Sequence, residues 1–127
     1  MKYLQDYQEK AQTALFEKTG AFFAFSTSQF NEQKKEGVKY VSLKAGLICP
    51  TENVEELING LYSIYKGAIK KDLKENGKEG IIKRELYNHE CFYTHDISSA
   101  FDILKDYGFT KEEIITEFYK ELPTVEF

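Results

Sequence analysis

The feature that most constrains the fold is a long amphipathic segment in the middle of the chain, from Thr51 to Asn76. Its apolar residues recur at three- and four-residue intervals, the spacing that places them on one face of an α-helix. Thr51 is a suitable N-cap, and Gly77 follows where a helix-ending glycine is expected. Gly60 and Gly67 interrupt the helix, and they either mark a closely packed neighbour or are simply tolerated. The predicted buried stripe comprises Val54, Leu57, Ile58, Leu61, Ile64, Tyr65, Ala68, Ile69 and Leu73.

The first fifty residues contain the only patterns that favour strands. Residues 2–19 predict an amphipathic helix, which ends before Gly20. Residues 21–25 are short, apolar and aromatic, which indicates a strand, and residues 29–36 predict a short helix after a serine-rich cap. Residues 38–43 and 47–49 predict a hairpin, with glycine in the left-handed conformation at its turn. A sheet of two or three antiparallel strands is therefore expected in this part of the chain.

The second half of the chain is predicted to be helical throughout. Residues 78–88 and 97–107 carry helical apolar patterns, and Asp96 is a good N-cap for the second of these. Thr110 and Glu113 have the spacing of a capping box for a last helix. The expected fold class is α+β, a small antiparallel sheet packed against an N-terminal helix and a helical C-terminal half. We expect a single domain over residues 1–127, because the length suits one domain and no linker is evident.

Hydropathy, cysteine content and charge limit the cell compartment and the kinds of partner that can be expected for this chain. The chain begins without the apolar stretch of a signal peptide, and no apolar run approaches the length of a membrane span, so a cytoplasmic protein with no membrane contact is expected. Two cysteines are too few for a disulfide framework. The net charge is -4, and residues 85–127 hold three lysines against ten acidic residues, which disfavours contact with phosphates there. Binding of nucleic acid is not expected.

The densest group of reactive side chains lies between His89 and Asp96. His89, Cys91 and His95 are the candidate catalytic residues, because a cysteine nucleophile needs a nearby base and a group to orient it. Zinc could also be held by sulfur and imidazole, but all the ligands would come from one short segment, so neither a metal nor a cofactor is expected. The alternative is that this segment is structural, with Cys91 in the core and the imidazole at a helix end.

Other residues are candidates for binding a partner. Nine tyrosines are more than a small core can bury with every hydroxyl satisfied, so several should lie at the surface, where tyrosine is typical of protein interfaces. Lysines repeat every fourth residue on the long helix and form either a basic ridge or an ordinary solvated face. The candidate binding residues are Tyr62, Lys66, Lys70, Tyr93 and Asp96.

Two stretches carry a resemblance to a known family. One is residues 20–26 followed by Gln29 and Phe30, and the other runs from Asn88 through Cys91 to Asp96, with Tyr107-Gly108 after it. They resemble a family of small uncharacterised proteins of gut Bacteroidales, their mobile elements and phages. The resemblance implies an accessory cytoplasmic protein, and it implies no reaction.

These observations favour a non-enzymatic function. The surplus of tyrosine and the lack of a catalytic signature predict a protein-binding or adaptor module that engages a protein partner or forms a homo-oligomer. The alternative is a small enzyme or metal-binding protein with its site at His89 to Asp96. In that case the two imidazoles and the thiol should converge on one cleft.

Overall fold

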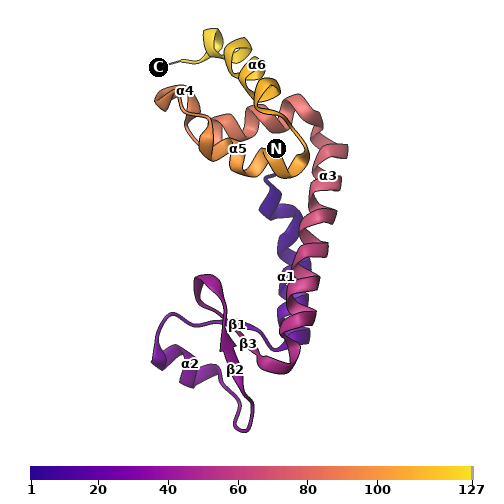
Figure 1. Ribbon diagram of the computed structural model, residues 1–127, viewed down its shortest axis with the longest axis vertical. Helices are drawn as coiled ribbons and strands as arrows, with labels where there is room; N and C mark the ends of the chain where they lie inside the picture. The colour runs from indigo at the N-terminus through magenta and orange to yellow at the C-terminus, as the bar shows by residue number, and fades with distance from the viewer. Residues whose placement is uncertain (127) are drawn as a thin grey trace. The chain divides into compact units, whose positions relative to one another are not determined.

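A computed structural model of the chain describes residues 1–126 and divides them into two compact units (Figure 1). The sheet unit consists of Gln5–Ala68, and the helical unit consists of Met1–Leu4 together with the residues from Ile69 onward. A small three-stranded antiparallel sheet, an N-terminal helix and a helical C-terminal half confirm the predicted α+β class. The expectation of one domain stays a prediction.

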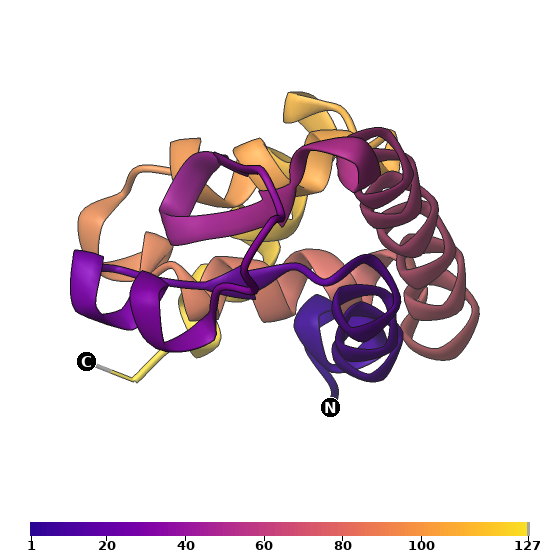
Figure 2. The same cartoon turned by 90° about the horizontal axis from the view of Figure 1, so that it is seen from below.

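The sheet unit contains α1 (Leu4–Thr19) from Gln5 onward and a sheet with the strand order β1-β3-β2. The three strands are β1 (Phe22–Phe23), β2 (Tyr40–Ser42) and β3 (Leu47–Pro50), and β3 pairs antiparallel with both neighbours. A short helix, α2 (Thr27–Gln33), connects β1 to β2 (Figures 1 and 2).

The two faces of the sheet are covered by different elements. Phe23 is paired with Leu47, so its side chain shares the face that Leu47 and Cys49 turn toward α1 and the start of α3 (Val54–Asn88). Phe22 lies on the opposite face, where the ring of Phe30 from α2 packs on it. The core of the unit on the first face comprises Ala21, Leu47, Cys49 and Leu57, with Leu15, Phe16, Leu43, Val54 and Leu61 at its margin.

The two glycines within the predicted long helix have different surroundings. A side chain at Gly60 would place its Cβ 2.7 Å from the Leu15 side chain, so α1 approaches α3 closely there. Nothing lies within 4 Å of the corresponding position at Gly67. Gly60 therefore marks a closely packed neighbour, and Gly67 is a tolerated glycine.

The helical unit contains the second part of α3 and three further helices. These are α4 (Cys91–Thr94), α5 (Ser98–Leu104) and α6 (Lys111–Glu121). The predicted break at Gly77 is confirmed, because its φ of 68° and ψ of 165° leave the helical region within α3. The predicted capping box of Thr110 and Glu113 begins α6. The buried apolar residues include Ile81, Ile82, Leu86, Phe92, Leu104, Ile114 and Phe118.

Several element boundaries differ from the predictions. The first strand is only Phe22–Phe23, because the chain turns into the Ser26 cap of α2, which itself ends at Gln33. A 3-10 turn, Thr51–Asn53, precedes α3, so Thr51 is not its N-cap. Between the helices predicted over residues 78–88 and 97–107 lies a further four-residue helix, α4. In the part of the chain that the structure describes, no helix has the length and apolarity needed to cross a membrane.

Candidate functional site

The predicted catalytic residues occupy different environments in the helical unit. Cys91 is buried at the start of α4, whereas His95 is exposed at its end, with its ring 6.0 Å from that of Phe118. His89 is half-buried, and its Nε2 atom has no hydrogen-bond partner among the described residues. The thiol thus lies in the interior while one of its two candidate bases lies at the surface.

The backbone around α4 explains why this segment is so compact. Glu90 and His95 both adopt left-handed conformations, with φ of 55° and 57°, so the chain reverses before and after the helix. Between these reversals Phe92 inserts its ring at 4.8 Å from Tyr87 and 5.1 Å from Phe118. Cys91 and Phe92 therefore fill the core of the unit, which is a structural role.

The electrostatics of the segment disfavour a cysteine nucleophile. Burial raises the pKa of the Cys91 thiol, and a hydrogen bond with the Ala100 backbone only partly opposes this. A catalytic cysteine needs the opposite shift, because the thiolate is the reactive form. Asp96 accepts hydrogen bonds from the Ser98 hydroxyl and N–H, which lower its pKa. The N-cap of α5 is Ile97, without a side-chain cap bond, rather than the predicted Asp96. Among residues 1–126, no group of three His, Cys, Asp or Glu side chains could hold a metal ion.

The predicted binding residues fall in both units. Tyr62 and Lys66 lie together on α3 in the sheet unit, with the ammonium group 5.2 Å from the centre of the ring. Lys70, Tyr93 and Asp96 belong to the helical unit, and all three are exposed. The structure thus brings one pair of the five candidates into contact.

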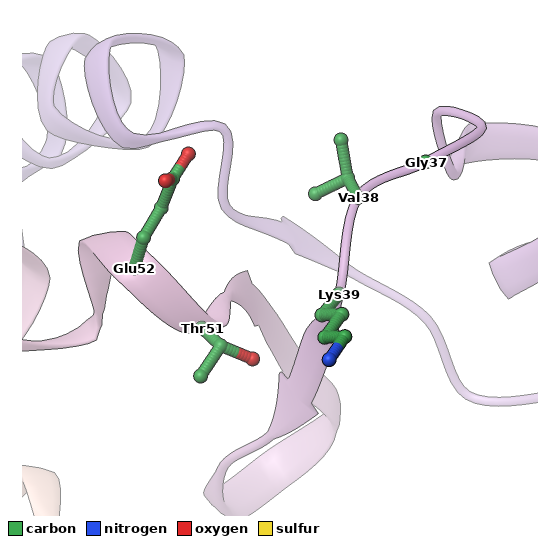
Figure 3. A pocket seen from close by; sticks show the side chains of 5 residues that line it. All are labelled: Gly37, Val38, Lys39, Thr51 and Glu52. Atoms are coloured by element: carbon green, nitrogen blue, oxygen red, sulfur yellow. The ribbon is translucent and has the colours of Figure 1, made fainter.

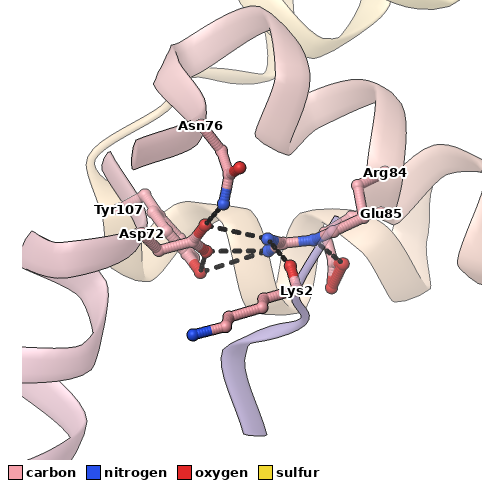
Figure 4. A network of polar contacts seen from close by, with 6 residues as sticks. All are labelled: Lys2, Asp72, Asn76, Arg84, Glu85 and Tyr107. Atoms are coloured by element: carbon pink, nitrogen blue, oxygen red, sulfur yellow. Dashed lines mark hydrogen bonds and ion pairs between the residues drawn. The ribbon is translucent and has the colours of Figure 1, made fainter. Parts of the chain in front are cut away.

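A buried polar network in the helical unit was missed by sequence reasoning (Figure 4). Arg84 donates to both carboxylate oxygens of Asp72 at 2.8 Å, and the Tyr107 hydroxyl donates to the same carboxylate at 2.5 Å. Asn76 adds a further bond to Asp72 at 2.7 Å. The available signal was the position of Asp72, four residues after Ala68 on the apolar stripe, where a charge requires a partner.

The pKa shifts in this network follow from its hydrogen bonds. Burial alone would raise the pKa of Asp72, but the bonds from Arg84, Tyr107 and Asn76 outweigh it and lower that pKa. Burial and the bond to Asp72 both raise the pKa of Tyr107. Arg84 also donates to the Glu85 carboxylate and to the Lys2 carbonyl, which ties the N-terminus into the unit. Because its polar groups are buried and bonded to one another, the network stabilises the fold rather than forming an open site.

The hollow in Figure 3 lies in the sheet unit and is lined by Gly37, Val38, Lys39, Thr51 and Glu52. Its volume of about 380 Å³ would suit a small ligand. All five lining residues are exposed, however, and the only charged ones are a lysine and a glutamate of opposite sign. The lining lacks both the enclosed apolar wall of a ligand pocket and a nucleophile with its base.

The strongest candidate site is a pair of exposed phenylalanines at the end of β1. The rings of Phe23 and Phe25 stack at 6.3 Å with an interplanar angle of 8°, although their exposed fractions are 46% and 73%. The Phe25 ring packs against Gly46, because a Cβ there would lie 2.4 Å from a ring atom. The Phe25 N–H also donates to Gln29 Oε1 at 2.7 Å. We call Phe23 and Phe25 the phenylalanine surface.

The sequence predicts only part of this surface. Alternation along the strand indicates that Phe23 and Phe25 share one face of the sheet. It does not show that the helix α1 covers that face only as far as the contact between Phe16 and Phe23. Exposure of the pair depends on where α1 ends its contact with the sheet, which is a tertiary property.

Comparison with known proteins gives a family and nothing more specific. No curated protein matches the chain, and no solved structure matches it. A family model described as a family of unknown function, DUF7659, matches residues 4–122, which is nearly the whole chain. The chain therefore belongs to the DUF7659 family.

Proposed function

We propose that the protein is a non-enzymatic protein-binding module and that the phenylalanine surface is its binding site. One observation carries this proposal: Phe25 exposes 73% of its surface to solvent although its ring stacks on that of Phe23 and packs against Gly46. These contacts restrict the rotamers of the ring, so it has less conformational entropy to lose on binding.

The chemistry of the side chain distinguishes this surface from the exposed tyrosines. Tyr62, Tyr93 and Tyr119 are also exposed, by 61%, 64% and 66%. Each carries a hydroxyl that water can solvate, so exposure of tyrosine is compatible with an unbound surface. Phenylalanine has no polar group, and two stacked rings gain more from being covered.

The setting of the protein is part of the same proposal. The resemblance in residues 20–26 and 88–96 supports an accessory role in a phage or mobile element. Cys49 and Cys91 are both free thiols, which suits a reducing cytoplasm. In such a setting the partner would be a protein of the host or of the element.

Site-specific photo-crosslinking tests the proposal. A photoreactive phenylalanine analogue replaces Phe25 in one variant, and Tyr62 or Tyr119 in two matched controls with similar exposure. The full-length variants are irradiated in the cells that express them, and the adducts are compared by mass spectrometry. We expect a discrete adduct at position 25 that is absent at positions 62 and 119.

A second set of variants separates binding from folding. Phe25→Asp should abolish the adducts formed from a probe at position 23 while leaving the circular dichroism spectrum unchanged. No adduct at position 25, or the same adducts at all three positions, would show that the phenylalanine surface is not a binding site.

A further inference from the structure

The outer edge of β1 is covered by two glutamine side chains. The Ala24 N–H bonds to Gly46 on the β3 side, so the backbone groups of Phe23 and Phe25 point away from β3. There the Phe23 carbonyl accepts from Gln33 Nε2 at 2.9 Å, and the Phe25 N–H donates to Gln29 Oε1 at 2.7 Å. Both glutamines belong to α2, and their amides occupy the positions that another strand would use.

The element that supplies this cover is weakly held. α2 has seven residues, and none of them is buried. Its one large apolar residue, Phe30, packs on Phe22 at 6.2 Å and on Tyr40 at 5.6 Å. A helix this short is not stable by itself, so it depends on this ring, on the two glutamine bonds and on the Ser26 cap. Loss of one of these contacts would weaken the cover of β1.

Once uncovered, the edge of β1 can pair with the same edge of a second copy of the chain. Residues 21–25 carry no charge, so two copies can approach without repulsion. A two-fold axis at Ala24 would oppose Phe23 of one copy to Phe25 of the other. Opposed residues in an antiparallel ladder alternate between hydrogen-bonded and non-hydrogen-bonded pairs, and Phe23 opposite Phe25 would be a hydrogen-bonded pair that uses the Phe23 carbonyl and the Phe25 N–H. The same pairing would bring the exposed rings of both copies side by side.

We propose that α2 is a displaceable cover and that the partner of this edge is a second copy of the chain, paired β1 to β1 about Ala24. This inference rests on the proposed function, because the phenylalanine surface becomes the centre of the interface. When Gln29 and Gln33 withdraw, the Phe25 N–H and the Phe23 carbonyl lose their side-chain partners and bond to the backbone of the second copy instead. The result is a continuous six-stranded sheet across the dimer.

Sedimentation of the full-length protein over a wide concentration range tests this inference. Gln29→Ala/Gln33→Ala removes the two covering bonds, and Phe30→Ser removes the anchoring ring of α2. The matched control is Asn31→Ala/Glu32→Ala on the same helix. We expect the glutamine variant to dimerise about tenfold more tightly than the parent chain, because more of the protein is in the open state. The control should behave as the parent chain does.

An engineered disulfide tests the geometry. At the proposed axis the two Ala24 residues form a non-hydrogen-bonded pair, whose Cα atoms lie roughly 4.5 Å apart and within disulfide range. Ala24→Cys in the glutamine variant should therefore give a covalent dimer on oxidation, whereas Ser28→Cys should not. A monomer in every variant, or a dimer that Ala24→Cys fails to link, overturns the inference. Adducts with a different protein from a probe at position 25 would still support the proposed function in that case.

Discussion

The helical unit and the sheet unit differ in where their aromatic rings lie. The helical unit buries the rings of Phe92, Phe109 and Phe118, and its buried Asp72, Arg84 and Glu85 are bonded to one another. The buried core of the sheet unit, Ala21, Leu47, Cys49 and Leu57, contains no ring, and its ring contacts run from Phe16 through Phe23 to the exposed Phe25. Among the described residues of the helical unit, the large exposed rings are tyrosines, whose hydroxyls water can solvate, whereas Phe23 and Phe25 carry no polar group and gain more from being covered.

The largest expected effect comes from breaking the charge network of the helical unit. Arg84→Met would leave the carboxylates of Asp72 and Glu85 buried without their cation, and we expect a loss of about 3–5 kcal/mol in the free energy of unfolding. The neighbouring control is Lys83→Met, whose ion pair with Glu121 is partly exposed, so its loss should cost much less. Urea denaturation measures both. Equal losses of unfolding free energy in the two variants would show that the buried network stabilises the fold no more than the exposed ion pair does.

The next largest loss of stability is expected where the Phe25 ring packs against Gly46 in the sheet unit. Gly46→Ala forces a side chain into a left-handed conformation and places its Cβ 2.4 Å from the Phe25 ring. Gly37→Ala is the matched control, because its φ of +78° is similar and nothing lies within 4 Å. The backbone cost of about 1–2 kcal/mol is common to both. We expect Gly46→Ala to destabilise the protein more than Gly37→Ala in thermal unfolding and to shift the NMR resonances of Phe25. Equal unfolding temperatures for the two variants would mean that the Phe25 ring does not pack against Gly46.

A smaller effect is the response of the helical unit to acid. The pKa of Asp72 is lower in the folded protein than its ordinary value of 3.8, so its contribution to stability is complete above that value and is lost as the pH falls through the folded-state pKa. Carbon-detected NMR should show the Asp72 carboxyl titrating below 3.8. Tyr107→Phe removes one donor and should raise this pKa toward the ordinary value. Titration at or above the ordinary value in the parent chain would contradict the assigned bonds.

The smallest expected effect is on the stability of a Phe25 variant. Because most of its ring is already exposed, Phe25→Ala should change the free energy of unfolding by less than about 1 kcal/mol. Phe92→Ala in the helical core should instead cost about 3–5 kcal/mol. Chemical denaturation of the two variants checks this contrast. A large loss for Phe25→Ala would make the ring a structural residue rather than a binding residue.

Local signals predicted much of the fold. The break at Gly77, the capping box of Thr110 and most of the apolar stripe were readable from residues close together in the sequence, but Ile58 of the predicted buried stripe is 51% exposed. The Asp72–Arg84 pair was not predicted, because its members lie 12 residues apart on either side of that break. The exposure of Phe25 and the covering of β1 by two glutamine side chains were also not predicted. Both depend on which elements pack against the strand, which is a tertiary property.

Hydrogen exchange monitored by NMR tests the central claim, that the sheet unit opens at α2 while the helical unit stays closed. The Phe25 N–H is bonded to a side chain of α2, whereas the N–H groups of Ile82 and Leu86 lie inside the second part of α3 among buried residues. We predict that the Phe25 amide exchanges much faster than the other two and that Gln29→Ala accelerates it further. Equal protection of all three amides would show that α2 does not open independently, and it would contradict this account.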